Sequence, residues 1–198
     1  PSKKERKLRA ILLDFAREHH LDAKEDVTGN IVISKAATQG FESSPGVILQ
    51  SHMDMVCEKN SDVIHDFEND PIETYIDGEW VRARGTTLGA DNGIGMAASL
   101  AVLASDNLQH GPLEALFTVD EETGLTGAFG MKEGFISGDY LLNLDSEDEA
   151  EIFIGCAGGI DTTSTFTYKP TMTPADYFYF RVSISNLQGG HSGSDINK

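Results

Sequence analysis

Three apolar runs in this chain share one feature: each ends in side chains that can bind a metal. The runs are VILQSHMDM at 47–55, LEALFTVDEETG at 113–124 and YLLNLDSEDEAEIFIG at 140–155. Their apolar stretches have the length and composition of buried strands. In an open α/β sheet, ligands bind at the carboxyl ends of the strands, so the side chains that end these runs are predicted to meet at one edge. They are His52, Asp54, Glu121, Glu122 and Asp145.

The first run ends in a histidine and an aspartate two residues apart. Residues at this spacing project from the same face of a strand, so His52 and Asp54 are expected to lie together. His52 can bind a metal through an imidazole nitrogen, while Asp54 fixes the tautomer and orientation of the ring. The alternative is a surface histidine beside an aspartate, and this motif alone does not exclude it.

A glycine-rich turn carries Asp91 into an apolar helical run, RARGTTLGADNGIGMAASLAVLA at 82–104. Gly89, Gly93 and Gly95 allow the backbone to turn tightly and to approach a ligand closely. Asp91 is therefore expected at a strand-to-helix junction, where it joins the candidate metal ligands. The alternative is a dinucleotide-binding loop, but the GxGxxG spacing is absent and an aspartate would repel a pyrophosphate.

Adjacent carboxylates follow the second run, at Asp120, Glu121 and Glu122. At the end of a buried strand they repel one another unless cations neutralise them, and a dication is the usual partner. A solvated acidic loop is the alternative. The third run repeats the pattern at Asp145, whereas residues 146–149 are typical of a solvated turn.

The order of elements predicts an α/β fold with a mostly parallel sheet covered by helices on both faces. The domain boundaries that we predict are 1–160 for a metal-binding domain and 161–198 for the start of a second, α+β domain. A loop and hairpin excursion is expected at 56–84. The expected helices lie at about 4–19, 93–105 and 124–132, and the expected strands near 30–35, 46–51, 113–119, 139–144, 151–155, 162–168 and 177–186.

Composition favours a soluble protein that binds neither nucleic acid nor membranes. The chain has 15 Lys and Arg against 32 Asp and Glu, and its formal charge of −17 repels phosphate backbones. No apolar run approaches the length of a membrane span, and no signal peptide opens the chain. Cys57 and Cys156 are too few for a disulfide framework and sit in apolar settings, so we expect reduced, buried thiols and a cytoplasmic location.

Together the motifs resemble the co-catalytic zinc metallopeptidases, a family that includes aminoacylase, glutamate carboxypeptidases and carnosinase. The segments SHMDMV, GTTLGADNGIGMA, HGPLEALFTVDEETG, GCAGGID and LQGGHSG are similar to its aminoacyl-histidine dipeptidase branch, and the resemblance spans nearly all of residues 1–198. It implies hydrolysis of dipeptides, above all Xaa-His substrates such as carnosine, with two Zn²⁺ ions as cofactors. Mn²⁺ or Co²⁺ would suit the same mixed nitrogen and oxygen ligands.

The resemblance also implies a ligand set for the two ions. Asp91 would bridge them, His52 and Asp145 would complete the protein ligands of one ion, and Glu122 would bind the other. One family ligand, a histidine near the carboxyl terminus, has no counterpart before Lys198.

Further roles follow from the same resemblance. Glu121 would act as the general base and Asp54 would orient His52. The domain that begins at 161 would be a lid, and His191 in GGHSG would reach from it toward a partner subunit's active site, which implies a homodimer formed through that domain. The peptide bond between Asp91 and Asn92 would be cis.

Two expectations concern the chain as a whole. It begins at Pro1 without a methionine and ends soon after a strand-like run, so we expect an N-terminal fragment whose catalytic domain lacks its C-terminal part. The alternatives to a dipeptidase are a related tripeptidase, an N-acyl amino acid deacylase or a non-catalytic binding module. The second carboxylate, Glu121 beside Glu122, favours an enzyme, because a binding module has little use for it.

Overall fold

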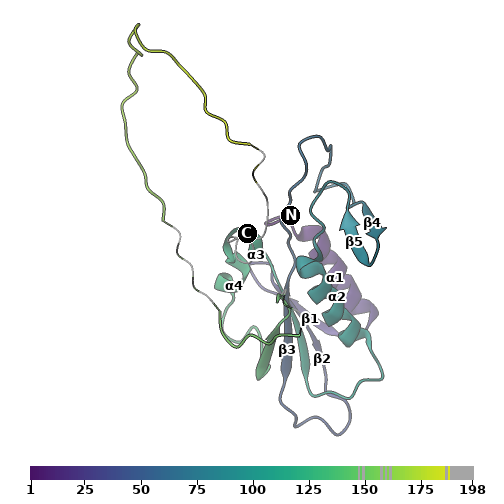
Figure 1. Ribbon diagram of the computed structural model, residues 1–198. Coiled ribbons are helices and arrows are strands. Elements are labelled where there is room, and N and C mark those ends of the chain that lie inside the picture. Colours follow the sequence, from purple (N-terminus) through teal and green to yellow (C-terminus); the bar gives the residue numbers. More distant parts are fainter. Residues whose placement is uncertain are drawn as a thin grey trace. The chain divides into compact units, whose positions relative to one another are not determined.

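The computed structural model describes residues 1–146, 148, 150–156, 158, 160, 162–185 and 187. By their internal contacts the residues divide into two units, 1–154 and 155–198. The first unit is built on a five-stranded sheet with the order β1-β2-β6-β3-β7 (Figure 1). These strands are β1 (Asp22–Glu25), β2 (Ile31–Lys35), β6 (Leu113–Thr118), β3 (Val47–His52) and β7 (Tyr140–Asn143).

The sheet is mostly parallel, as predicted. Strand β3 runs parallel to both β6 and β7, while β2 pairs antiparallel with β6 and with β1. Four of the five strands therefore point the same way, and β2 alone among them is reversed. Consequently β3, β6 and β7 open their carboxyl ends at one edge, where the polar residues that follow them can meet.

Helices α1 (Arg6–Glu18) and α2 (Ala90–Ala104) lie on one face of the sheet (Figure 1). Alternate residues of the central strand β6 divide between the two faces, because successive side chains on a strand point in opposite directions. Phe117 packs in a cluster with Leu12 of α1 and Met96 of α2, whereas Leu116 packs in a second cluster with Ile48. The cover on this second face comes from the segment 131–136, which contributes Met131, Phe135 and Ile136.

Short helices follow the central strand. The helix expected at 124–132 is instead two pieces, α3 (Glu121–Gly124) and α4 (Thr126–Gly130). They are separated by Leu125, whose backbone lies in the left-handed region at φ 54° and interrupts the helical path. Helix α3 itself begins after Asp120, close to the end of β6 and at the edge where the strands open.

Some strand predictions are wrong. The structure adds β1, whose sequence DAKE has no apolar alternation and whose four residues are all exposed. The apolar run at 151–155 forms no strand, and Ile152 and Ile154 are 92% and 100% exposed. No strand occurs among the described residues of 162–185 either. An alternating pattern becomes a strand only when another strand accepts its hydrogen bonds, and these runs have no such neighbour in the described part of the chain.

The excursion between β3 and α2 contains the predicted hairpin, formed by β4 (Thr74–Asp77) and β5 (Trp80–Ala83). Gly78 in its turn has a φ of 62°, which explains the glycine. Cys57 and Cys156 are both free thiols. The expected burial is wrong for Cys156, which is exposed, and Cys57 is half-buried. Within the described residues, no helix combines the length and the apolar character that a membrane crossing needs.

Candidate functional site

His52 ends strand β3 and is almost fully buried, with 1% of its side chain exposed. Its Nδ1 lies 2.9 Å from the backbone carbonyl oxygen of Asp54. A carbonyl can only accept, so Nδ1 carries the proton that it donates there. In the neutral ring this leaves the lone pair on Nε2, which faces Asp91 Oδ1 at 2.9 Å and Asp145 Oδ1 at 3.5 Å. The ring is thus held in the tautomer that presents Nε2 as a metal ligand.

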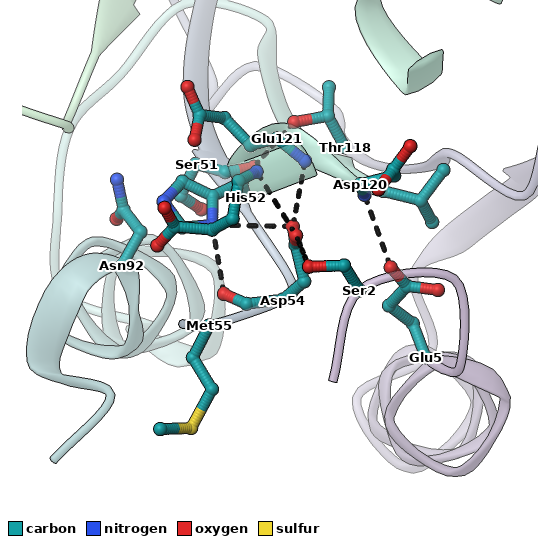
Figure 2. A network of polar contacts seen from close by, with 12 residues as sticks. Ser2, Glu5, Ser51, His52, Asp54, Met55, Asn92, Thr118, Asp120 and Glu121 are labelled. Carbon is teal, nitrogen blue, oxygen red and sulfur yellow. Dashed lines mark hydrogen bonds and ion pairs between the residues drawn. The ribbon is translucent and has the colours of Figure 1, made fainter. Parts of the chain in front are cut away.

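Asp54 connects β3 to the start of α3 (Figure 2). Its carboxylate accepts the backbone N–H groups of Glu121 at 3.0 Å and Glu122 at 3.2 Å, and the hydroxyl of Ser2 at 2.6 Å. Burial alone would raise the pKa of Asp54, but His52 and these donors hold it well below its usual range. Asp54 is therefore a permanent anion that ties the two glutamates to the histidine.

Asp91 and Asp145 face His52 from the other side. Asp91 lies at the start of α2, after Gly89 at φ 76°, and its peptide bond to Asn92 is cis, which confirms that prediction. Asp145 follows β7 and accepts a hydrogen bond from the Asn92 side-chain amide. A Cβ at residue 95 would lie 2.0 Å from Asn92 Oδ1, so a larger residue would displace the amide that donates to Asp145. The turn predicted from the glycines therefore aims Asp91 at the histidine.

The three adjacent carboxylates after β6 do not act alike. Asp120 is 1% exposed and has a φ of 53°. It accepts the hydroxyl of Thr126 at 2.6 Å and that of Thr123, so its charge is satisfied within its own loop. Glu121 and Glu122 are half-buried instead, and burial raises the pKa of each carboxyl. The repulsion expected among these carboxylates therefore concerns the two glutamates and not Asp120.

Two groups of potential metal donors share His52. Its ring, Asp91 and Asp145 form one group, and its ring, Glu121 and Glu122 form the other. Within each group the ligand atoms all lie within 4.8 Å of one another. One imidazole surrounded by carboxylates is a donor set that suits Zn²⁺, Mn²⁺ or Co²⁺. The residues present therefore fit a metal centre.

The electrostatics of the site point to a cation as well. Burial alone lowers the pKa of the His52 imidazole, but Asp145, Asp54 and Asp91 outweigh it and raise the pKa to about 11. Burial and the neighbouring Asp145 raise the pKa of Asp91, whereas the hydrogen bond from His52 lowers that of Asp145. Without a metal, the excess of negative charge is thus relieved by a proton on the ring. A dication would relieve it more completely and would displace that proton.

A hollow of about 620 Å³ opens beside this centre, between α2 and the residues that follow β7. Asp91 and Asp145 lie on its wall together with Asn92, Ile94 and Leu144. The wall thus combines carboxylates with apolar surface, as small-molecule sites commonly do.

The structure brings together every candidate residue that it describes. His52, Asp54, Asp91, Glu121, Glu122 and Asp145 converge, while His191 lies outside the described residues. Sequence reasoning missed Asn92, Ser2 and Glu5. Asn92 had a signal, since it follows Asp91 directly. Ser2 and Glu5 had none, because they lie 52 and 115 positions from their hydrogen-bond partners.

Comparisons with known proteins identify the family of the chain. A family model described as peptidase family M20/M25/M40 matches residues 48–186. The chain is 52% identical to the cytosol non-specific dipeptidase of Escherichia coli (strain K12) over 197 residues, which are 100% of this chain and 41% of that protein. It spans less than half of that relative's length.

Solved structures give the same result. The aminoacylhistidine dipeptidase of Vibrio alginolyticus matches with a TM-score of 0.77 and 58% identity, over 79% of this chain and 32% of that one. A tripeptidase from Staphylococcus aureus matches with a TM-score of 0.61 and 26% identity, over 74% of this chain and 39% of that one.

Proposed function

We propose a function from one premise: the chain belongs to peptidase family M20/M25/M40. The protein is a metal-dependent dipeptidase, and its active site is the pair of donor groups around His52. The observation that carries this proposal is that two sets of carboxylates share one buried imidazole, with all ligand atoms of each set within 4.8 Å. Relatives with dipeptidase names match the whole chain at 52% identity and most of it at 58%.

In this proposal the site would hold two Zn²⁺ ions. Asp91 would serve both ions, His52 and Asp145 would complete the protein ligands of one, and Glu122 would bind the other. The position of His52 Nε2 supports grouping His52 with Asp91 and Asp145 at one ion, because the Nε2 lone pair faces both carboxylates. A further histidine outside these 198 residues would complete the second ion. Mn²⁺ and Co²⁺ are possible substitutes, since they accept the same donors.

Peptide hydrolysis needs an activated water molecule and a base that accepts the proton of that water. Dications bound at these groups lower the pKa of water and polarise the scissile carbonyl. Glu121 is the general base, which takes the proton from the water and delivers it to the departing amine. Its backbone N–H is fixed by Asp54, and burial raises the pKa of its carboxyl, which makes it a better proton acceptor. Asp54 also orients the His52 ring, because its backbone carbonyl oxygen accepts a hydrogen bond from His52 Nδ1.

The substrate is a dipeptide, with Xaa-His dipeptides such as carnosine as the preferred class. The name of the Vibrio alginolyticus relative supports this specificity, whereas the name of the Escherichia coli relative indicates a broader one. A tripeptidase is a second candidate within the family, on the evidence of the Staphylococcus aureus structure. An N-acyl amino acid deacylase and a non-catalytic binding module complete the alternatives.

Beyond the site, we propose the domain division 1–160 and 161–198, with the second part beginning a lid and dimerisation domain. In a homodimer formed through that domain, His191 would reach the partner subunit's active site and stabilise the reacting carbonyl oxygen. A cytoplasmic location accords with the name of the Escherichia coli relative.

Replacement of the proposed base in the complete protein tests the enzyme assignment. Glu121→Gln should lower kcat by about 10²- to 10⁴-fold, the usual contribution of a general base, while zinc content stays the same. Glu133→Gln is the matched control, because Glu133 is an exposed carboxylate on the segment 131–136. Full activity of zinc-loaded Glu121→Gln would show that Glu121 is not the base.

A substrate panel separates the remaining alternatives. The zinc-loaded wild-type protein should give a higher kcat/KM on Xaa-His dipeptides than on tripeptides or N-acyl amino acids. A preference for tripeptides or for acyl substrates would replace the dipeptidase assignment. Binding of dipeptides without turnover of any substrate would favour the binding module.

A further inference from the structure

Residues 1–5 lie against the back of the metal centre, away from the cavity-lining residues. The Ser2 hydroxyl donates to Asp54 Oδ2 at 2.6 Å, and the Glu5 carboxylate accepts the backbone N–H of Asp120 at 3.1 Å (Figure 2). The same Glu5 oxygen, Oε1, accepts the backbone N–H of Lys3 at 2.8 Å. Lys3 Nζ lies 3.7 Å from the Asp120 carboxylate. The segment thus contacts both residues that hold the start of α3.

Ser2 donates a hydrogen bond to the Asp54 carboxylate, which joins the end of β3 to the start of α3. Asp54 Oδ2 receives two donors, the Ser2 hydroxyl at 2.6 Å and the Glu122 N–H at 3.2 Å. The shorter bond is the one from Ser2, and short hydrogen bonds from a hydroxyl to a carboxylate are among the stronger ones. Any rotation of the Asp54 carboxylate moves the acceptors of both glutamate N–H groups and the contact with the His52 ring.

Glu5 acts on the turn that aims the two glutamates. Asp120 is a non-glycine residue in the left-handed region, at φ 53° and ψ 49°, and its N–H is buried. A buried N–H needs a partner, and Glu5 supplies it from the turn that starts α1. Since α1 is anchored in the core through Leu12 and Ala16, the turn is held by a rigid element.

We propose that Ser2 and Glu5 are positioning residues for the metal centre, acting through Asp54 and Asp120 on the placement of Glu121 and Glu122. The inference rests on the proposed function for its catalytic consequence but not for its effect on metal binding. Neither residue contacts the donor atoms of the two metal-binding groups, so their effect is transmitted through hydrogen bonds. Outer hydrogen-bond partners of this kind typically change metal affinity by about 10- to 100-fold.

The test compares four variants at Ser2 and Glu5, and a fifth as a control, with the complete wild-type protein. Ser2→Ala removes the hydroxyl, and Ser2→Thr keeps it. Glu5→Ala removes the acceptor, whereas Glu5→Gln keeps a side-chain oxygen that can accept from Asp120. Lys4→Ala is the control, because Lys4 lies in the same segment but its exposed side chain bonds Glu68.

Three quantities are measured: the zinc dissociation constant by competition with a chromophoric chelator, kcat and KM on a dipeptide, and Tm. We expect Ser2→Ala and Glu5→Ala to weaken zinc binding by about tenfold and to lower kcat by a similar factor, with KM within twofold. Ser2→Thr and Glu5→Gln should restore both quantities to within about threefold of wild type, and Lys4→Ala should match wild type.

The outcomes separate this proposal from its premise. If Ser2→Ala and Glu5→Ala lower Tm but leave zinc affinity and kcat unchanged, the segment is a structural anchor and the proposal is wrong. Failure of the conservative variants to rescue zinc affinity would also overturn it. If wild type binds zinc but hydrolyses no peptide, the proposed function fails, while the comparison of zinc affinities still decides the positioning role. Should Glu5→Ala not fold, Ser2→Ala and Ser2→Thr decide it alone.

Discussion

The side chains of His52 and Asp54 are 1% and 0% exposed, whereas those of Asp91 and Asp145 are 47% and 25% exposed. The first pair belongs to an inner half of the site, made of His52 and Asp54 at and just after the end of β3, and Glu121 and Glu122 on α3. The second pair is an outer half, which lies at the start of α2 and after the edge strand β7. The two halves meet at the ring of His52.

The halves differ in what holds them. In the inner half, Asp54 accepts two backbone N–H groups and a hydroxyl, so the geometry is maintained by the fold without a metal. In the outer half, Asp91 and Asp145 face the His52 ring, and Asn92 supports Asp145. Strand β7 itself is exposed at all four residues. Stability should therefore depend on the inner half, and metal binding on both.

The largest effect on stability is expected for Asp54→Ala. The substitution leaves two N–H groups without acceptors beside a buried histidine, so the free energy of unfolding should fall by about 3 kcal/mol. Urea denaturation of the metal-free protein measures this. A loss below about 1 kcal/mol would show that the inner half is not held by this carboxylate.

The next largest effect concerns the packing behind α3. A Cβ at Gly127 would lie 2.4 Å from the Val119 carbonyl oxygen and 2.5 Å from Asn30 Oδ1, so Gly127→Ala should cost about 2 kcal/mol of stability. The control is Gly93→Ala in α2, where a Cβ meets no atom within 4 Å. That control should be neutral or slightly stabilising in thermal unfolding. Equal losses in the two variants would show that the close contacts around Gly127 do not account for its loss of stability.

Metal binding should depend on pH because zinc and a proton compete for His52. In the metal-free protein its pKa is raised to about 11, so the ring is protonated at neutral pH and must lose that proton to bind zinc. The zinc dissociation constant should therefore fall by about tenfold, or 1.4 kcal/mol, for each unit of pH rise between 6 and 9.

The stability of the metal-free protein should change in the opposite direction. A raised pKa stabilises the folded state fully below the unfolded value of about 6.5, and this contribution is lost as pH rises toward 11.

The proton that His52 releases when zinc binds is measured by calorimetric titration with zinc in buffers of different ionisation enthalpy. Zinc affinity that does not vary with pH would show that the ring is neutral before the metal binds.

The smallest effect on stability is expected for Asp145→Ala in the outer half. Because this carboxylate is partly exposed and follows an edge strand, its removal should change the free energy of unfolding by less than about 1 kcal/mol. Its removal should nevertheless weaken zinc binding by about 100-fold, because it is a proposed ligand. A stability loss as large as that of Asp54→Ala would abolish the distinction between the halves.

The apolar runs were sufficient to predict β2, β3, β6 and β7 within one or two residues at each end. Strand β1 was missed because its residues are polar and exposed, so it has no hydrophobic pattern to detect. The run at 151–155 was assigned wrongly for the opposite reason. Its side chains are apolar, but Ile152 and Ile154 are exposed and the segment pairs with no described strand. Hydrophobicity thus indicates which residues can be buried, whereas pairing determines which become strands.

The site was predictable in its members and less so in its internal order. Among the three carboxylates that follow β6, only the family resemblance gave the two glutamates roles that Asp120 lacks, and no local pattern explains the difference. The fold separates them, because Asp120 turns at φ 53° toward Thr123 and Thr126 while the next two residues enter α3 beside His52.

By itself, the sequence determined which side chains meet, because strands that run in one direction deliver the residues after them to a common edge. It also determined the turn at Asp91, through glycines that permit it. Only the tertiary structure decided that Asp54 joins His52 to Glu121 and Glu122, and that residues 1–5 support this junction. The contacts of Asp54 with α3 and those of residues 1–5 connect positions 52 to 115 residues apart, and no local pattern encodes which distant groups will fill the hydrogen bonds of a buried carboxylate.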